Sequence, residues 1–118
     1  MAYVDGFLVP VPKGKIAEYR RMAQKAGKVW KEHGALEFRE CVGDDLDVKM
    51  GRSFKDWASL KRGETLMFSW IVYKSKAQRD RVNAKVMKDP RMNEMDEKTM
   101  PFDVNRMCYG GFKVLVDL

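Results

Sequence analysis

Residues 89–112 have the sequence DPRMNEMDEKTMPFDVNRMCYGGF, and this stretch shows how the second half of the fold closes. Asp89-Pro90 predicts the end of a helix, because proline cannot continue a helix and restricts the residue before it. Met100-Pro101-Phe102-Asp103 then predicts a crossing segment anchored by proline. The final strand, expected over 106–116, contains Gly110-Gly111, where another group can approach the backbone closely.

Hydrophobic periodicity predicts the elements that precede this stretch. We expect strands over 3–11, 35–42 and 64–73, and a helix over 14–33 that ends at a left-handed Gly34. The second helix begins at the capping box Ser75-x-x-Gln78 and runs to about Asp89. Residues 43–63 are the least regular part, where Phe54 and Trp57 indicate a short amphipathic turn or an extended arm. A short helical turn is expected near 91–97.

The element order is therefore β-α-β-β-α-β, which is typical of an α+β, ferredoxin-like fold. It consists of a four-stranded antiparallel sheet with two helices on one face. The 118 residues suit one domain, 1–118, and the 45% apolar content suffices for a core. No leader-like or membrane-length apolar run is present, so we expect a cytoplasmic protein that has no membrane partner and keeps Cys41 and Cys108 reduced.

The alternation of each strand predicts which side chains share a face of the sheet. We assign the set that meets the helices as Val4, Leu8, Leu36, Phe38, Val42, Leu66, Phe68, Trp70 and Val72. The second face then carries Tyr3, Asp5, Phe7, Val9, Glu37, Arg39, Cys41, Met67, Ser69, Ile71 and Tyr73. This face is too apolar to remain in water, and a second copy of the chain is the simplest cover.

We therefore expect a homodimer with a cavity between its two sheets. The polar and aromatic residues of the second face are the ligand-binding candidates: Asp5, Phe7, Arg39, Cys41, Ser69 and Tyr109. In this interpretation Arg39 faces the interior and holds either Asp5 or an anionic ligand. The alternative is that Asp5 and Arg39 simply pair with each other, or lie at the rim of the sheet in water.

Seven motifs together resemble the YbaA-like family of uncharacterised small bacterial proteins. They are Tyr3-Val4-Asp5-Gly6-Phe7, Glu40-Cys41-x-Gly43-Asp44-Asp45, Phe68-Ser69-Trp70-Ile71, Ser75-Lys76-Ala77-x-Arg79-Asp80, Asp89-Pro90-Arg91-Met92, Met100-Pro101-Phe102-Asp103 and Arg106-Met107-x-Tyr109-Gly110-Gly111-Phe112. The resemblance implies a dimeric α/β-barrel and no established activity. The chain departs from the family pattern at Val42, at Asp47-Val48-Lys49 and at Val104, so the loop after the second strand is expected to differ in shape.

The residue inventory argues against a metal or cofactor. His33 is the only histidine, it falls at a helix end, and no second His or Cys lies at ligand spacing. Gly43-Asp44-Asp45 predicts a solvated turn. Five methionines cluster at 87, 92, 95, 100 and 107, where we expect them to fill irregular gaps, with Cu(I) binding as the alternative.

Three functions remain open. The first is a small-molecule binding or sensing module. The second, which rests on fold analogy alone, is an enzyme similar to cofactor-independent oxygenases. The third is weak nucleic-acid binding, which rests only on the net charge of +6; without interleaved aromatic residues we expect no specific nucleic-acid partner.

Overall fold

The structure, a computed structural model, describes all residues 1–118 and has the element order expected from the sequence. The elements are β1 (Tyr3–Pro12), η1 (Lys13–Lys15), α1 (Ile16–Glu32), β2 (Glu37–Val42), α2 (Phe54–Trp57), β3 (Glu64–Tyr73), α3 (Lys76–Lys88), η2 (Pro90–Glu94), η3 (Glu97–Thr99), η4 (Val104–Arg106) and β4 (Cys108–Lys113). Here η denotes a 3₁₀ turn. The last strand is shorter at both ends than the expected 106–116.

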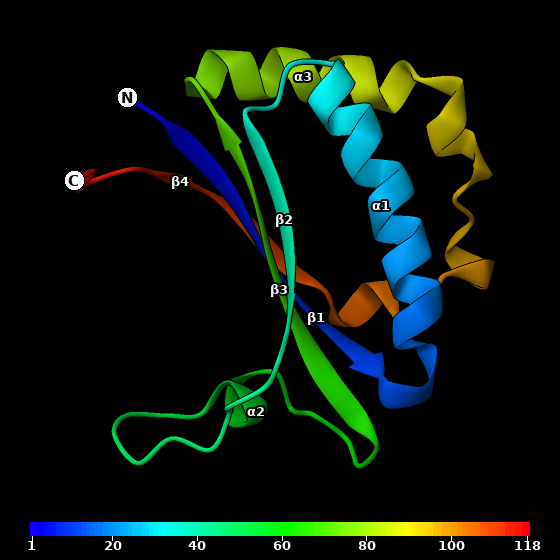
Figure 1. The fold of residues 1–118 in the computed structure, drawn as a ribbon, viewed down its shortest axis with the longest axis vertical. Helices are drawn as coiled ribbons and strands as arrows, with labels where there is room; N and C mark the ends of the chain where they lie inside the picture. Colours follow the sequence, from blue (N-terminus) through cyan, green and yellow to red (C-terminus); the bar gives the residue numbers. More distant parts are fainter.

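The four strands form one antiparallel sheet in the order β2-β3-β1-β4, which confirms the ferredoxin-like arrangement. The two central strands pair along their whole length, from Tyr3 opposite Tyr73 to Pro12 opposite Glu64. Helices α1 and α3 and the segment 89–107 all lie on one side of this sheet (Figure 1). The other side is concave and carries only the arm 43–63 at one end of the sheet.

Helix boundaries follow local signals in the sequence. Gly34 ends α1 with a φ of 119°, the left-handed conformation expected there. The Ser75 hydroxyl caps α3 by accepting a hydrogen bond from the Gln78 amide at 3.1 Å. The side chain of Gln78 accepts a hydrogen bond from the backbone amide of Lys74. In a standard capping box this side chain would instead accept from the backbone amide of the N-cap residue, here Ser75. Helix α3 ends directly before Asp89-Pro90, as predicted.

The assignment of sheet faces in β1 and β3 was wrong. In β1, Tyr3, Asp5 and Val9 face the helices and are buried, and Ile71 and Tyr73 of β3 belong to the core that packs against α1 and α3. Both faces of these strands are apolar, so alternation alone does not distinguish inside from outside. In β2, Phe38 does pack toward the helices as predicted, whereas Leu36 and Val42 are about half exposed.

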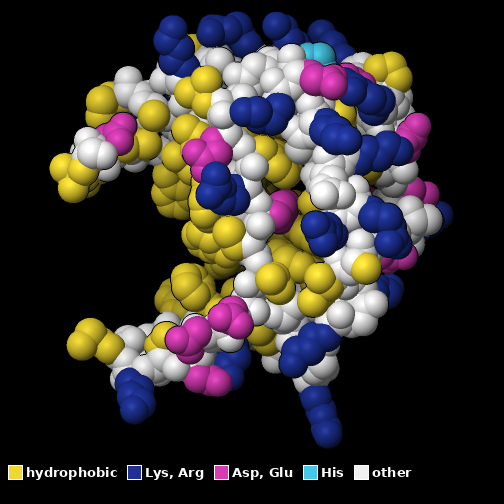
Figure 2. All heavy atoms as spheres, in the orientation of Figure 1, with side chains coloured by type: hydrophobic (Ala, Val, Ile, Leu, Met, Phe, Trp, Pro, Cys, Tyr) yellow, Lys and Arg dark blue, Asp and Glu magenta, His cyan; other side chains and the backbone are white.

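The sheet therefore has an open face, formed by Val4, Leu8, Phe68, Trp70, Val72 and Phe112. Figure 2 shows hydrophobic side chains gathered along this concave side of the molecule. Phe68 and Phe112 remain 45% and 61% exposed in the single chain. This is the face that a further layer would have to cover.

The arm 43–63 contains the short turn predicted from Phe54 and Trp57. Ser53 caps α2 by accepting a hydrogen bond from the amide of Lys55. Phe54 packs against Phe68 of the open face, with ring centroids 6.2 Å apart. Trp57 does not pack down: it is 69% exposed, and the guanidinium of Arg52 lies 5.2 Å from the centre of its ring.

None of the helices combines the length and the apolar character that a membrane crossing requires.

Candidate functional site

A cavity of about 530 Å³ lies between the sheet and the layer formed by α1, α3 and the segment 89–107. Its walls are mainly apolar, with aromatic rings from Phe7 and Tyr109 of the sheet and from Trp30 of α1. Met87 and Tyr109, which are 63% and 71% exposed, line it where it meets solvent. The cavity therefore belongs to a single chain and does not require a second sheet, contrary to the expectation from the sequence.

Flexible methionines form much of the wall. All five members of the predicted cluster, Met87, Met92, Met95, Met100 and Met107, line the cavity, and Met22 of α1 joins them. Their unbranched thioether chains suit an irregular space and adapt to the shape of a bound group. The segment 89–107 thus supplies an adaptable wall opposite the rigid sheet.

One end of the cavity holds a buried ion pair. Arg79 of α3 donates from Nη1 to Asp5 Oδ1 at 3.1 Å, and from Nη2 to the Tyr3 hydroxyl at 3.3 Å. The guanidinium also lies 4.9 Å from the centre of the Tyr3 ring. Burial raises the pKa of Asp5 above its ordinary 3.8, and the charge of Arg79 opposes this only in part. Arg79 therefore offers no free charge to a ligand while it is bound to Asp5.

Asn83 joins the two helices to the sheet beside this pair. Its side-chain oxygen accepts a hydrogen bond from Trp30 Nε1 of α1 at 3.1 Å and one from the Tyr73 hydroxyl of β3 at 3.2 Å. Burial, and next the charge of Asp5, raise the pKa of Tyr73, so this phenol keeps its proton. The network gives the apolar cavity one rigid polar corner.

Glu40 of β2 is a second carboxyl in the cavity wall. The Tyr19 hydroxyl of α1 donates to Glu40 Oε2 at 2.9 Å. Burial raises the pKa of Glu40, and hydrogen bonds from Tyr19 and Ser69 oppose this effect. Burial also raises the pKa of Tyr19, followed by the charge of Glu40, so Tyr19 remains a donor. No Lys, Arg or His forms an ion pair with Glu40 in the structure.

The structure brings together four of the six predicted site residues. Asp5, Phe7, Ser69 and Tyr109 all line the cavity, and the rings of Phe7 and Tyr109 stack with centroids 5.8 Å apart at an angle of 16°. These residues share a face because they occupy alternate positions on the neighbouring strands β1, β3 and β4.

Arg39 and Cys41 lie apart from that group. Arg39 points away from the helices, is 62% exposed, and lies 3.4 Å from Glu37. The prediction that Arg39 holds Asp5 is therefore wrong, because Arg79 takes that role. Arg39 lies on the open side of the sheet, so its burial in a dimer and its binding of a ligand stay predictions. Cys41 lines a surface groove between α1 and the outer edge of β2, which shares Tyr19 and Glu40 with the cavity wall. Both cysteines are free thiols.

Sequence reasoning missed Glu40, Arg79 and Asn83. Arg79 and Asn83 fall on the same helical stripe as the buried Val82 and Val86, at the three- and four-residue spacings that define one face. Glu40 follows Phe38 at the two-residue spacing of a strand, so it shares the face of a residue assigned to the core. Each residue had a usable signal in its spacing.

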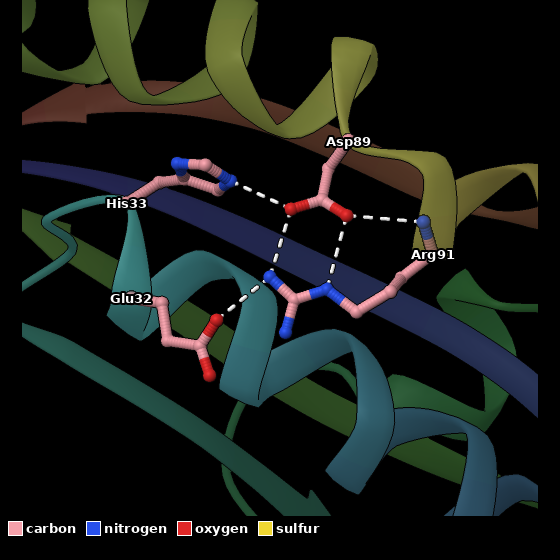
Figure 3. A network of polar contacts seen from close by, with 4 residues as sticks. All are labelled: Glu32, His33, Asp89 and Arg91. Carbon is pink, nitrogen blue, oxygen red and sulfur yellow. Dashed lines mark hydrogen bonds and ion pairs between the residues drawn. The ribbon is translucent and has the colours of Figure 1, made fainter.

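His33 belongs to a different network, at the end of α1 (Figure 3). Its Nε2 lies 2.8 Å from Asp89 Oδ2, and Arg91 donates to both oxygens of Asp89 at 3.0 and 2.8 Å. Arg91 also pairs with Glu32 at 2.7 Å. Hydrogen bonds from Arg91 and then from His33 hold the pKa of Asp89 well below its usual range. This network fastens the start of the segment 89–107 to α1, which agrees with a structural role for His33.

Comparison with solved structures supports the fold alone. The "De novo designed protein Foldit4" aligns with a TM-score of 0.50, covering 97% of this chain and 99% of that chain. Its sequence identity is 12%, so the likeness extends to the arrangement of helices and strands and not to any site.

Sequence comparison finds relatives of nearly the same length. "Uncharacterized protein YbaA" of Escherichia coli (strain K12) is 47% identical over 117 residues, covering 99% of each chain, and the protein of that name in Shigella flexneri matches to the same extent. Residues 2–104 also match the family described as "Protein of unknown function (DUF1428)". The resemblance expected from the seven motifs is thus confirmed, and this chain belongs to the DUF1428 family, together with YbaA.

Proposed function

We propose that this protein binds a small, mainly apolar molecule in the cavity between its sheet and its helices. The observation that carries the proposal is the cavity itself, because about 530 Å³ lies within the range of pockets that take small ligands. Its lining also fits that class, since apolar walls surround a few polar groups at defined positions. The methionine-rich wall provides the adaptability that ligand entry requires.

A variant that fills the cavity tests this proposal. Ala26 of α1 lines the cavity and is buried, whereas Ala17 of the same helix is exposed. Ala26→Leu should reduce binding of a ligand that co-purifies with the parent, detected by native mass spectrometry, and Ala17→Leu should not. Equal ligand occupancy in both variants would place the bound molecule elsewhere, and a parent that retains no ligand and binds none from a metabolite library would contradict the proposal.

We also propose that a second copy of the chain covers the open face. The support is the run of apolar side chains on that face, which are too extensive to remain in water. In such a homodimer the two sheets would pack against each other, and each chain would keep its own cavity on the helix side.

Light scattering at micromolar concentration tests the homodimer. Phe68→Arg places a charge at the centre of the open face and should yield monomers, whereas Ala84→Arg on the exposed side of α3 should not change the mass. A parent that remains monomeric at this concentration would refute the dimer. Ligand binding would be unaffected by that result, because the cavity is formed within one chain.

A catalytic use of the same cavity is the second candidate. Burial raises the pKa of both Asp5 and Glu40, and a carboxyl with a raised pKa in a cavity is a candidate proton donor or acceptor. An enzyme would convert the bound molecule, whereas a binding module would release it unchanged. Mass spectrometry of the released ligand over time separates the two. Glu40→Gln should stop conversion of the ligand molecules that it still binds only if the protein is an enzyme.

A further inference from the structure

Glu40 is a half-buried carboxyl that lies between the apolar cavity and the groove along α1. Arg20, Lys28 and Lys31 line that groove, but none of them forms an ion pair with Glu40. Its bonded neighbour, Tyr19, is neutral, and no basic side chain of the chain pairs with it. Taking a carboxylate out of water is costly, so buried carboxylates in proteins are normally paired with a cation or hold a proton. The cavity therefore has a position where a positive charge is missing.

The other charged groups of the cavity wall do not supply that charge. They are Asp5, Glu97 and Arg79, and Arg79 is committed to Asp5 at 3.1 Å. The lining thus carries three carboxylates and a single guanidinium, although the chain as a whole has a net charge of +6. An anionic ligand would meet repulsion in this cavity, and a cationic one would meet attraction.

Aromatic rings lie on the same part of the wall. Phe38 is two residues from Glu40 on β2, and its ring lies 6.2 Å from that of Trp30. Tyr19, which holds Glu40, packs edge-on against Phe102 at 5.8 Å. Aromatic faces attract an organic cation through their quadrupole, and they also accommodate the hydrocarbon to which it is attached.

We propose that the ligand of this cavity is an apolar organic cation, an amine on an aromatic or branched hydrocarbon group. Its ammonium group binds Glu40, and its hydrocarbon part lies against the methionine and aromatic walls. This inference rests on the proposed small-molecule function and adds the chemical class of the ligand.

Three probes that share a phenylethyl group test the inference: 2-phenylethylamine, 2-phenylethanol and 3-phenylpropionate. Their affinities are measured by NMR titration of the full-length protein. A hydrogen bond between two charged groups contributes more free energy than one between neutral groups, and the difference corresponds to about a tenfold change in affinity. The amine should therefore bind about tenfold more tightly than the alcohol, and the carboxylate should bind most weakly.

Variants then locate the amine. Glu40→Gln keeps the size of the side chain and should lower amine affinity to that of the alcohol, while alcohol binding stays unchanged. Glu18→Gln removes a charge from the exposed side of α1 and should change neither. Circular dichroism is used to check that each variant is folded. If Glu40→Gln does not fold, the order of affinities of the three probes for the parent protein still tests the inference.

The possible results separate this inference from the proposed function. If the alcohol and the amine bind with equal affinity and both fail to bind to Ala26→Leu, the inference of a cationic ligand is overturned. The cavity is then supported as a binding site. Amine binding that survives Glu40→Gln would also overturn it. If none of the three probes binds at millimolar concentration, both the inference and the proposed function are contradicted.

Discussion

Replacing Arg79 by methionine tests whether Asp5 depends on a buried ion pair. The side chain of Asp5 is 6% exposed and that of Arg79 is 22% exposed, so water cannot replace the lost guanidinium fully. The variant loses the bonds to Asp5 at 3.1 Å and to the Tyr3 hydroxyl at 3.3 Å. Methionine keeps much of the volume, so the effect on stability should come from the unpaired carboxyl.

The cost has an upper limit set by protonation of Asp5. If the unpaired Asp5 takes up a proton on folding at pH 7, the cost is about 1.4 kcal/mol for each pH unit above its ordinary pKa of 3.8. The total is about 4 kcal/mol. Hydrogen bonds to Asn83 and Tyr73 still stabilise the charge, so we expect a loss of about 2–4 kcal/mol in the free energy of unfolding at pH 7.

This loss should depend on pH in a defined direction. Without Arg79 the folded-state pKa of Asp5 rises further above its unfolded value, so the folded protein holds the proton more strongly than the unfolded chain does. The difference between variant and parent should therefore grow from pH 4 to pH 7, and at pH 4 it should fall to about 1 kcal/mol or less. Urea unfolding followed by circular dichroism, at fixed protein concentration, measures it at each pH.

Two further variants make the result specific to the ion pair. Arg81→Met removes an exposed arginine two residues along α3 and should leave stability nearly unchanged. Adding Asp5→Asn to Arg79→Met should recover part of the loss, because it removes the unpaired charge. The buried ion pair would be refuted if Arg79→Met lost the same free energy of unfolding at pH 4 and pH 7, or lost less than about 1 kcal/mol at pH 7.

Three other predictions concern the end of α1, the packing of β2 and the surface charge. Asp89→Asn should be less stable than the parent at pH 7, and the difference should shrink as the pH falls below 3.8. Hydrogen bonds from Arg91 hold the pKa of Asp89 low, so the stability that the Asp89 carboxylate contributes is lost when it takes up a proton. Urea midpoints between pH 2.5 and 7 test this. Gly27→Ala should cost roughly 1–3 kcal/mol in denaturant unfolding, since the added Cβ would lie 2.7 Å from the Phe38 ring, whereas Gly14→Ala meets open space and serves as the control. Nucleic-acid binding should be weak and should disappear at moderate salt in a mobility-shift assay, because release of counterions would be its only driving force. Tight, sequence-dependent binding near physiological salt would contradict this.

The element order was predictable because each boundary has a local chemical cause. Gly34 takes a left-handed conformation, Ser75 caps α3, and Pro90 cannot continue it. The choice of sheet face depends on tertiary packing instead. In β1, Tyr3 and Phe7 lie on one side and Val4 and Leu8 on the other, so hydrophobicity alone favours neither side.

The members of the candidate site could be grouped from the sequence only where the faces of paired strands were assigned consistently with one another. Asp5 and Phe7 share a face with Ser69 because β1 and β3 pair directly. Arg39 was grouped with them because the faces of β1 and β3 were assigned the wrong way round, whereas that of β2 was assigned correctly. In the observed register Glu40, and not Arg39, lies opposite Ser69.

The net charge of +6 is an apparent objection to a cationic ligand, and the positions of the charges answer it. Arg20, Lys28 and Lys31 of α1 line the groove on the outer side of Glu40, but they are exposed to solvent and form no ion pair with it. Salt screens exposed charges beyond about 8 Å at physiological ionic strength. Glu40 would contact a ligand directly at the wall of the apolar cavity, where the effective dielectric is lower than in water. The outer charge therefore affects how fast a cation approaches, while the carboxylates of the wall determine how tightly it is held.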